Sequence, residues 1–410
     1  MSTALLAADP LLSGGIDFGV FAVVVVKVVV AFVFLLIATM LMVWFERKLV
    51  SDMQNRIGPN RAGPWGILQT LADGTKLFFK EHINPIRTER TVFVIAPFLS
   101  FVPAFLLFCI VPVGGNWANG GDGTVELFGK TTYLQIADPP IGILFALAMS
   151  SIAVYGVMLA GWSSGSKYPL LGSVRASAQM VSYEAAMGLS AMAVVLVTGT
   201  LSTHGMVVNQ AGPGLFGVLP NWAVFTTLLV PFVIFVIAGT AELNRPPFDL
   251  VEAEQELVAG FNTEYSSMRF AFFFLAEFMN TITMSAIFVT LFLGGPSGPA
   301  PVGPAWVWSI IWFFLKTGAF LFMFVWFRAT LPRFRYDQLM DLGWKLLIPL
   351  SLGWLLLLAA VNLAGQEQWN PMAVGLGVIV MFLVGSSLLR AANAKAKAVH
   401  QGDNAEGVNA

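Results

Sequence analysis

A chain of 410 residues is long enough for two or three soluble domains, but its composition excludes that arrangement. Apolar residues make up 57% of the chain and charged residues only 11%, against about 45–50% and about 25% in soluble domains. A formal net charge of −1 argues against nucleic acid as a partner. One cysteine, Cys109, and three scattered histidines exclude a disulfide framework and a Cys/His metal centre. The sequence therefore predicts an all-α polytopic membrane protein with no redox metal of its own.

Nine stretches have the roughly 20 consecutive, mostly apolar residues that a helix needs to cross a bilayer core. They are residues 18–45, 91–113, 139–162, 176–200, 223–242, 268–294, 305–327, 344–364 and 371–390. The first Lys or Arg is Lys27, which lies inside the first stretch, so the N-terminus lacks the basic region of a signal peptide. No internal repeat is visible, which argues against an inverted-repeat transporter.

The basic residues lie almost entirely on one side of the predicted membrane. Of the 22 Lys and Arg residues, Lys130 alone falls on the opposite side, and Lys27 and Lys316 fall within spans. The other 19 are Arg47, Lys48, Arg56, Arg61, Lys76, Lys80, Arg87, Arg90, Lys167, Arg175, Arg245, Arg269, Arg328, Arg333, Arg335, Lys345, Arg390, Lys395 and Lys397. Because cytoplasmic loops are enriched in Lys and Arg, we expect the N-terminus outside, the C-terminus in the cytoplasm, and the function at the inner face.

The first inner loop contains an amphipathic helix. Gly63-Pro64 is a helix-start signal. Apolar residues then recur at helical spacing opposite a polar face: Ile67, Leu68, Leu71 and Phe78 on one side, and Gln69, Asp73, Lys76 and Lys80 on the other. A plain anchor at the membrane surface explains this pattern equally well. The placement of Asp73 among cations favours a paired polar site instead.

A second inner loop is strongly acidic. Between Glu242 and Glu264 there are six acidic residues and one base. The Pro246-Pro247 pair breaks any helix, and we expect a short helix to restart near Leu250. In that helix Glu252 and Glu256 would share a face, where like charges cost stability. The loop is therefore either fully solvated or a site that needs several protonatable carboxylates close together.

Three carboxylates fall at membrane depth, in the inner halves of three successive helices: Glu184, Glu242 and Glu277. Asn280 and Thr281 share a helical face with Glu277 and extend it into a polar stripe. A carboxylate at this depth is costly and normally marks an ion or proton path. The alternative is a structural pair with Lys27 or Lys316. We expect one water-filled cavity within reach of all three acids, with few cations nearby.

Two further inner segments contain motifs that allow more than one interpretation. The segment 328–339 has three arginines beside aromatic residues, which could bind lipid phosphate, dock a partner or line a site. The segment 160–179 is predicted to be a turn of small residues that leads into the helix of Glu184. Small residues allow close helix packing, so a structural role explains most of it.

Four inner stretches form long and specific motifs. They are Glu46-Arg47-Lys48 with Gln54-Asn55-Arg56-Ile57-Gly58-Pro59-Asn60, Gly161-Trp162-Ser163-Ser164 with Lys167-Tyr168, Arg245-Pro246-Pro247-Phe248-Asp249-Leu250 with Glu252-Ala253-Glu254, and Arg333-Phe334-Arg335-Tyr336-Asp337-Gln338-Leu339. Together they resemble the quinone-site membrane subunit of proton-pumping NADH:quinone oxidoreductase, respiratory complex I. In bacteria this is the H subunit of the complex. The resemblance extends from the first helix to about the eighth.

The resemblance implies a membrane floor for a quinone chamber, roofed by peripheral-arm subunits that carry the terminal iron–sulfur cluster. The implied chamber residues are Glu46, Arg47, Asp73, Lys76, Arg245, Glu252, Glu254 and Glu256. The implied proton path toward small membrane subunits and antiporter-like subunits is Glu184, Glu242, Glu264 and Glu277. Quinone is then the substrate, FMN and the iron–sulfur clusters belong to partner subunits, and this chain lies in the cell membrane among its lipids.

The family pattern has eight membrane helices, and this chain adds a predicted ninth. We therefore divide it into a membrane domain that resembles the complex I subunit, 1–364, and an extra transmembrane helix with a cytoplasmic tail, 365–410. Two alternatives remain at this point. One is the membrane subunit of a related energy-converting hydrogenase or dehydrogenase, which the quinone-side motif disfavours. The other is a secondary ion transporter, which the large charged inner face disfavours.

The asymmetry of basic residues gives a first testable prediction. Single cysteines introduced near Asn119 and near Gln401 should differ in intact cells. The position near Asn119 should react with an impermeant thiol reagent from outside, and the position near Gln401 should not. Labelling of the tail position from outside would rule out the nine-helix topology.

Overall fold

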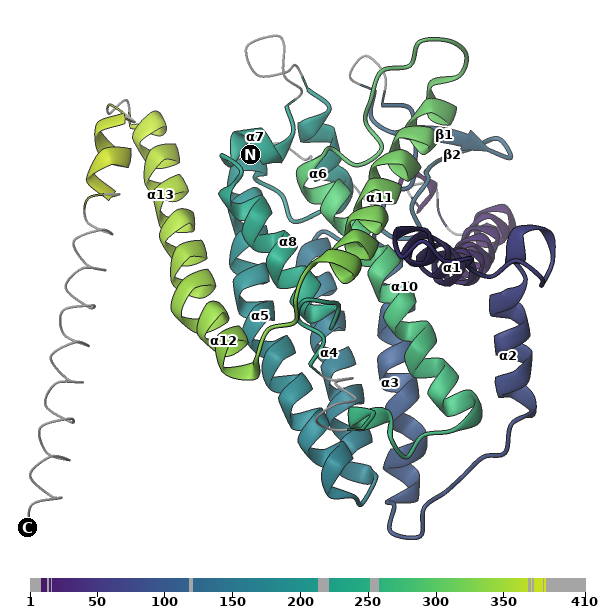
Figure 1. The fold of residues 1–410 in the computed structure, drawn as a ribbon. Helices are drawn as coiled ribbons and strands as arrows, with labels where there is room; N and C mark the ends of the chain where they lie inside the picture. The colour runs from purple at the N-terminus through teal and green to yellow at the C-terminus, as the bar shows by residue number, and fades with distance from the viewer. Residues whose placement is uncertain are drawn as a thin grey trace, which may run out of the picture.

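The computed structural model describes residues 9–12, 15, 17–117, 121–212, 221–250, 258–367, 370, 372–378 and 380. Within this part, seven helical segments are long and apolar enough to cross a membrane, and α8 (Val230–Glu242) is a shorter apolar helix (Figure 1). The seven are α1 (Phe18–Met53), α3 (Arg90–Phe108), α4 (Gly142–Ser163), α5 (Lys167–Thr198), α10 (Ser267–Phe292), α11 (Ala305–Thr330) and Tyr336–Gln366. The prediction of an all-α polytopic membrane protein is confirmed.

The last of these segments is continuous but not uniform. It consists of α12 (Tyr336–Asp341), a π-helical stretch (Leu342–Leu347) and α13 (Ile348–Gln366). The predicted ninth span is helical at 372–378. Most of its remainder, and the tail to residue 410, lie outside the described residues.

Short elements gather at one end of the helices, opposite the basic loops (Figure 1). They include α6 (Thr203–Gln210), α7 (Ala223–Thr226) and an antiparallel hairpin of β1 (Thr124–Leu127) and β2 (Lys130–Tyr133). Leu127 pairs with Lys130, so two residues connect the strands. Both of them, Phe128 and Gly129, have positive φ, which matches the tight turns that two-residue hairpins require.

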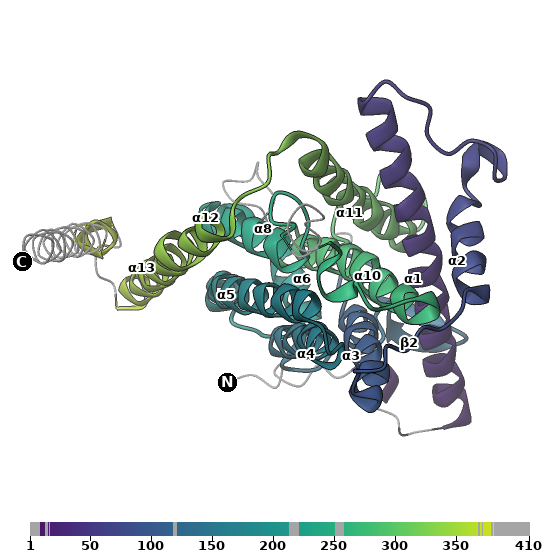
Figure 2. The ribbon, with the colours of Figure 1, turned by 60° about the horizontal axis from the view of Figure 1, so that its bottom comes forward.

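Helix α10 occupies the centre of the bundle, between α1, α3 and α11 (Figure 2). Of its most apolar segment 72% is buried, compared with 17% for α1. Its buried hydroxyls are hydrogen-bonded within the helix: Thr283, Ser285 and Thr290 each donate to the backbone carbonyl four residues earlier. A helix can therefore bury polar side chains in an apolar core because each one finds its acceptor within the same helix.

The predicted span 223–242 is interrupted, contrary to expectation. It forms α7 and then α8, separated by residues 227–229, of which Leu228 and Leu229 have positive φ. Pro231 explains the break, since proline has no N–H to donate and its ring clashes with the carbonyl of Thr227 four residues earlier. That carbonyl instead accepts a hydrogen bond from Trp354 Nε1 at 3.0 Å, so the break also ties α13 to the bundle.

The predicted small-residue turn in 160–179 is much shorter than expected. Helix α4 continues to Ser163 and α5 begins at Lys167, nine residues before the predicted start at 176. Pro169 sits in the first turn of α5, where its missing N–H costs nothing. Gly165, with φ +64°, makes the bend between the two helices.

The two lysines within the spans do not pair with the intramembrane acids. Lys27 contacts Asp9 at 2.8 Å and Thr132 Oγ1 at 2.5 Å, near the outer end of α1. Lys316 donates to the backbone carbonyls of Leu293, Gly295 and Ser297 at 2.7, 3.0 and 2.8 Å, just beyond the C-terminus of α10. The alternative of a structural pair with either lysine is therefore excluded.

The Lys316 contacts predict a large effect on stability. Lys316→Met keeps the apolar stem but leaves three carbonyls without their donor, so we expect the free energy of unfolding to fall by roughly 3 kcal/mol or more. Lys345→Met is the control, because Lys345 is exposed and pairs only with Asp341 one turn away, and should cost below about 0.5 kcal/mol. Thermal unfolding of the purified variants measures both, and equal melting temperatures would contradict the prediction.

Candidate functional site

Arg245 joins three helices at the end of the bundle that carries the basic loops. It follows the end of α8, and its Nη1 lies 2.9 Å from Glu46 Oε2 on α1. Its Nε lies 3.3 Å from Glu277 Oε1 on α10, and its guanidinium carbon lies 4.4 Å from the centre of the Phe278 ring. Arg245 and Glu46 are each 5% exposed. A buried guanidinium thus bridges two carboxylates that are far apart in the sequence.

The surroundings of Glu277 differ from expectation. The sequence pattern predicts few cations near the intramembrane acids, and for Glu277 this is wrong because Arg245 lies in ion-pair distance. Glu46 also has a second cation, since Arg328 at the inner end of α11 contacts its other carboxylate oxygen, Oε1. Four helices, α1, α8, α10 and α11, therefore meet through one charged cluster.

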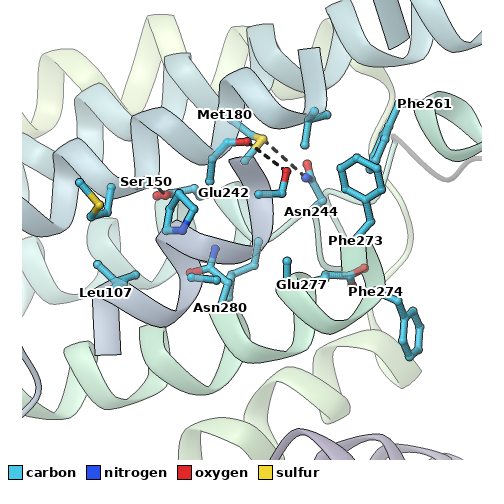
Figure 3. Close-up of a pocket in the computed structure, with 18 of the residues that line it drawn as sticks. Leu107, Ser150, Met180, Glu242, Asn244, Phe261, Phe273, Phe274, Glu277 and Asn280 are labelled. Carbon is cyan, nitrogen blue, oxygen red and sulfur yellow. Dashed lines mark hydrogen bonds between the residues drawn. The ribbon is translucent and has the colours of Figure 1, made fainter. Parts of the chain in front are cut away.

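A cavity of about 90 Å³ lies between α3, α4, α8 and α10, beside this cluster (Figure 3). Its polar lining comes from Ser100, Ser150, Glu242, Asn244, Asn262, Glu277 and Asn280. The volume is enough for a few water molecules, and the polar groups supply the partners that ordered waters need. Glu242 and Glu277 therefore share one polar cavity at membrane depth, as the sequence pattern predicts for these two acids. Glu184 is not among the lining residues.

Two serines connect α4 to acids on two other helices. Ser150 donates a hydrogen bond to Glu242 Oε1, and Ser151 donates one to Glu184 Oε1. Glu242 is 2% exposed, whereas Glu184 on α5 is half-buried. The cavity and the flank of α5 are thus connected through consecutive residues of α4.

Aromatic residues close the cavity on the side of the basic loops. Phe261 and Phe273 line it, and Tyr265 packs against Phe273 and stacks on Phe93 at 4.1 Å. The Tyr265 hydroxyl donates to the Phe93 carbonyl at 3.1 Å. Burial raises the pKa of Tyr265 to about 12, so this residue stays a neutral donor at physiological pH.

The predicted amphipathic helix is present as α2 (Gln69–Phe79), preceded by a 3₁₀ turn, Pro64–Gly66. It packs on α1 and α10, and two bonds fix it to α1: Trp44 Nε1 donates to the Trp65 carbonyl, and Thr70 Oγ1 donates to the Met40 carbonyl. No residue of α2 is buried, and apolar side chains such as Phe78 and Phe79 stay exposed. Such a helix suits a membrane surface.

Asp73 has the charged partner that the sequence pattern predicts. Its Oδ2 lies 2.6 Å from Arg47 Nη1, and both side chains are partly exposed. Lys76 is exposed on the same helix. Arg47 and Glu46 are neighbours in the sequence but face different partners, because one turns toward α2 and the other toward Arg245.

The remaining predicted site residues are placed only in part. Glu264 is half-buried in a turn before α10 and does not line the cavity. Glu252, Glu254 and Glu256, and the helix expected to restart near Leu250, lie in 251–257, outside the described residues. Across the described ranges, no group of three or more His, Cys, Asp or Glu side chains could hold a metal ion.

Several site contacts were missed from the sequence. Ser150 and Ser151 gave no signal, because serine is common on closely packed membrane helices. Arg333 was noted, but its partner was not: its Nη2 lies 3.0 Å from Asp249 Oδ2. In the same region the Phe334 N–H donates to the Pro247 carbonyl at 3.1 Å. Two inner loops of opposite charge thus dock on each other, which the charge pattern alone could have suggested.

This architecture defines a class of protein: a polytopic membrane subunit with a carboxylate-lined cavity beneath a charged inner face. A family model described as NADH dehydrogenase matches residues 26–359. The chain is 49% identical over 385 residues to the NADH-quinone oxidoreductase H subunit of Frankia casuarinae, covering 92% of this chain and 81% of the relative. For the corresponding H subunits of Frankia alni and Streptomyces avermitilis, identity is 48% over 403 residues (96% and 85% covered) and 45% over 392 residues (93% and 83% covered). The chain belongs to the family of H subunits of NADH-quinone oxidoreductase.

The Arg245 contacts predict that this residue holds the inner end of the bundle together. Arg245→Met leaves Glu46 and Glu277 facing each other without the cation between them, so we expect a loss of about 3 kcal/mol or more in the free energy of unfolding. Arg245→Lys keeps the charge but lacks the planar fork, so it should restore only part of that loss. Arg333→Met is the matched control, since its pair with Asp249 is partly exposed. If Arg245→Met melts no lower than Arg333→Met, the bridge is not structural.

Proposed function

We propose that this chain forms the membrane floor of the quinone chamber of complex I and passes protons from that chamber toward the pumping subunits. As a member of the H-subunit family it is a multi-pass membrane subunit of an enzyme with several subunits. The observation that carries the proposal is the buried bridge Glu46–Arg245–Glu277. At one end of this bridge, Glu46 precedes Arg47, which pairs with Asp73 of α2. At the other end, Glu277 lines the cavity with Glu242.

The residues assigned to the quinone chamber are Glu46, Arg47, Asp73, Lys76, Arg245, Glu252, Glu254 and Glu256. Those that are described fit this role by position. Arg47 and Asp73 form an exposed pair on the inner side, next to buried Glu46. Quinone reduction places negative charge on the quinone before protons arrive. This charge attracts nearby cations and repels nearby carboxylates. A change in the charge near Glu46 can therefore alter the electrostatic environment of Glu277 through Arg245, because the same guanidinium contacts both carboxylates.

The proton path is assigned to Glu184, Glu242, Glu264 and Glu277. Glu242 and Glu277 share the cavity, and Ser150 and Ser151 link Glu242 to the flank of Glu184. Carboxylates at membrane depth are costly and normally serve ion or proton movement. Glu264 lies nearer the inner loops, where protons would enter.

The assignment of the quinone chamber and the proton path to this chain also implies which subunits surround it in the complex. Peripheral-arm subunits with the terminal iron–sulfur cluster roof the chamber, with FMN and further clusters beyond it. Small membrane subunits and antiporter-like subunits receive the protons that leave this chain. The complex sits in the cell membrane with the basic loops and the tail in the cytoplasm. The division at residue 364 is supported by the family model, which ends at residue 359.

Isosteric substitutions separate the two roles. Glu184→Gln and Glu277→Gln keep the shape and can still hydrogen-bond, but they remove the titration, and Glu277→Gln also removes the negative charge that faces Arg245. Both should leave assembly intact and lower quinone turnover and proton pumping together, by about tenfold or more. Asp73→Asn and Arg47→Ala should act first on apparent quinone affinity or inhibitor sensitivity.

The measurement is NADH:quinone turnover and pumping in reconstituted vesicles. NADH oxidation by an artificial acceptor that bypasses the chamber is the control and should stay unchanged. If Glu184→Gln and Glu277→Gln, singly and together, turn over and pump like the parent, the acids are structural and the proton path is wrong.

A further inference from the structure

Ser150 and Ser151 occupy a special position between two acids. They are consecutive on α4, yet their hydroxyls bind carboxylates on two different helices: Ser150 binds Glu242 of α8, and Ser151 binds Glu184 of α5. Neighbouring residues of a helix point about 100° apart. One turn of α4 can therefore face α8 with one residue and α5 with the next, and it sits directly between the two acids.

Ser150 also marks the end of the polar cavity. It lines the cavity of about 90 Å³ that contains Glu242 and Glu277, and it lines a second cavity of about 20 Å³ on the far side. Every other residue that lines the small cavity is apolar. A space of that size holds one water at most, and a single polar side chain gives that water too few partners. The described residues therefore offer no polar route straight toward the outer face.

The polar route that does continue from Ser150 runs sideways. Ser150 is 7% exposed, Ser151 and Glu184 are half-buried, and the next residue of α5, Ala185, is exposed. Ser150 and Ser151 are adjacent on α4 and each donates to one acid, so the four groups lie in order from the cavity to the flank of α4 and α5. A proton that leaves this chain there arrives at a surface that a neighbouring membrane subunit can cover.

We propose that Ser150 and Ser151 are positioning residues that hold Glu242 and Glu184 as one proton-transfer unit and direct the path laterally, out of the cavity and onto the α4–α5 flank. This inference rests on the proton path of the proposed function. It adds two residues and a direction to that path.

The chemistry of the hydroxyl explains why serine suits this position. A serine hydroxyl donates to an ionised carboxylate and, after rotation, accepts from a protonated one. Each acid can therefore gain or lose its proton while keeping the same partner. In the transfer the proton leaves the Glu242 carboxyl and arrives at the Glu184 carboxylate, and both serines end neutral.

The other charged groups near this unit lie on one side. Arg245 and Glu277 approach from the turn after α8 and from α10, with Glu46 of α1 beyond them. On α5, the Tyr183 hydroxyl beside Glu184 is already used, since it donates to the Leu339 carbonyl at 2.9 Å. The two serines donate directly to the two acids, so their removal should act directly on them.

The test uses the assembled complex in vesicles. Ser150→Ala and Ser151→Ala should each lower quinone turnover with pumping by about tenfold, the factor expected for one lost hydrogen bond to a charged group. The pH profile of turnover should also move to higher pH, because a carboxylate without its donor gives up its proton less readily. Ser150→Thr and Ser151→Thr keep the hydroxyl and should restore both the rate and the profile.

A control variant and a pair of cysteine variants keep the test decisive. Ser190→Ala is the matched control: Ser190 is 1% exposed on α5, and its hydroxyl donates to the Ala186 carbonyl of its own helix, so this variant should behave like the parent. If the alanine variants do not assemble, Ser150→Cys and Ser151→Cys replace them, since a thiol fills nearly the same space but bonds weakly.

The possible outcomes distinguish a failure of the serine link from a failure of the proposed proton path. If Glu184→Gln and Glu277→Gln impair pumping while the Ala and Cys variants of both serines match the parent in rate and pH profile, the lateral link is wrong and the proton path stands. If the glutamate variants also behave like the parent, the proposed function fails and the inference falls with it. A loss that threonine does not restore would mean that the serines act through packing, which also overturns the inference.

Discussion

The buried guanidinium of Arg245 is the contact on which the inner half of this protein depends. A charge enclosed among membrane helices is tolerated only when it is paired, and Arg245 meets that condition with carboxylates from α1 and α10. Because Arg245 must stay paired, its contacts hold the end of α8 against α10 at the centre of the bundle. The cavity with Glu242 and Glu277 lies beside this contact.

The two halves of the membrane region are built by different means. In the outer half, Lys27 is tied to Asp9 and Thr132, and Lys316 is tied to three backbone carbonyls. Lys27 thus has one carboxylate and one hydroxyl partner, and the described hydrogen bonds of Lys316 all go to backbone carbonyls. In the inner half, the corresponding partners are carboxylates and serine hydroxyls, which can exchange protons and partners.

The helices also differ in how far they are enclosed, and this difference fits the proposed assembly. Helix α10 is largely buried within the chain, whereas α1 and α2 present apolar side chains outward. The half-buried Glu184 lies on the flank of α5, so the proposed proton path would reach a surface of the bundle. Exposed apolar helices are stable in lipid or against other membrane subunits, and both surroundings are expected for a subunit of a large membrane complex.

The sequence alone determined what depends on local composition: the positions of most spans, the amphipathic helix, the acids within apolar helices and the family motifs. The length of an apolar run and the spacing of polar residues are local properties, and a bilayer selects on them directly. Only the tertiary structure decided which side chains meet. The Arg245 bridge and the serine contacts of Glu242 and Glu184 depend on how each helix is rotated and tilted against its neighbours. A long apolar run leaves rotation and tilt undetermined, because lipid accepts any apolar face, and packing between helices fixes them.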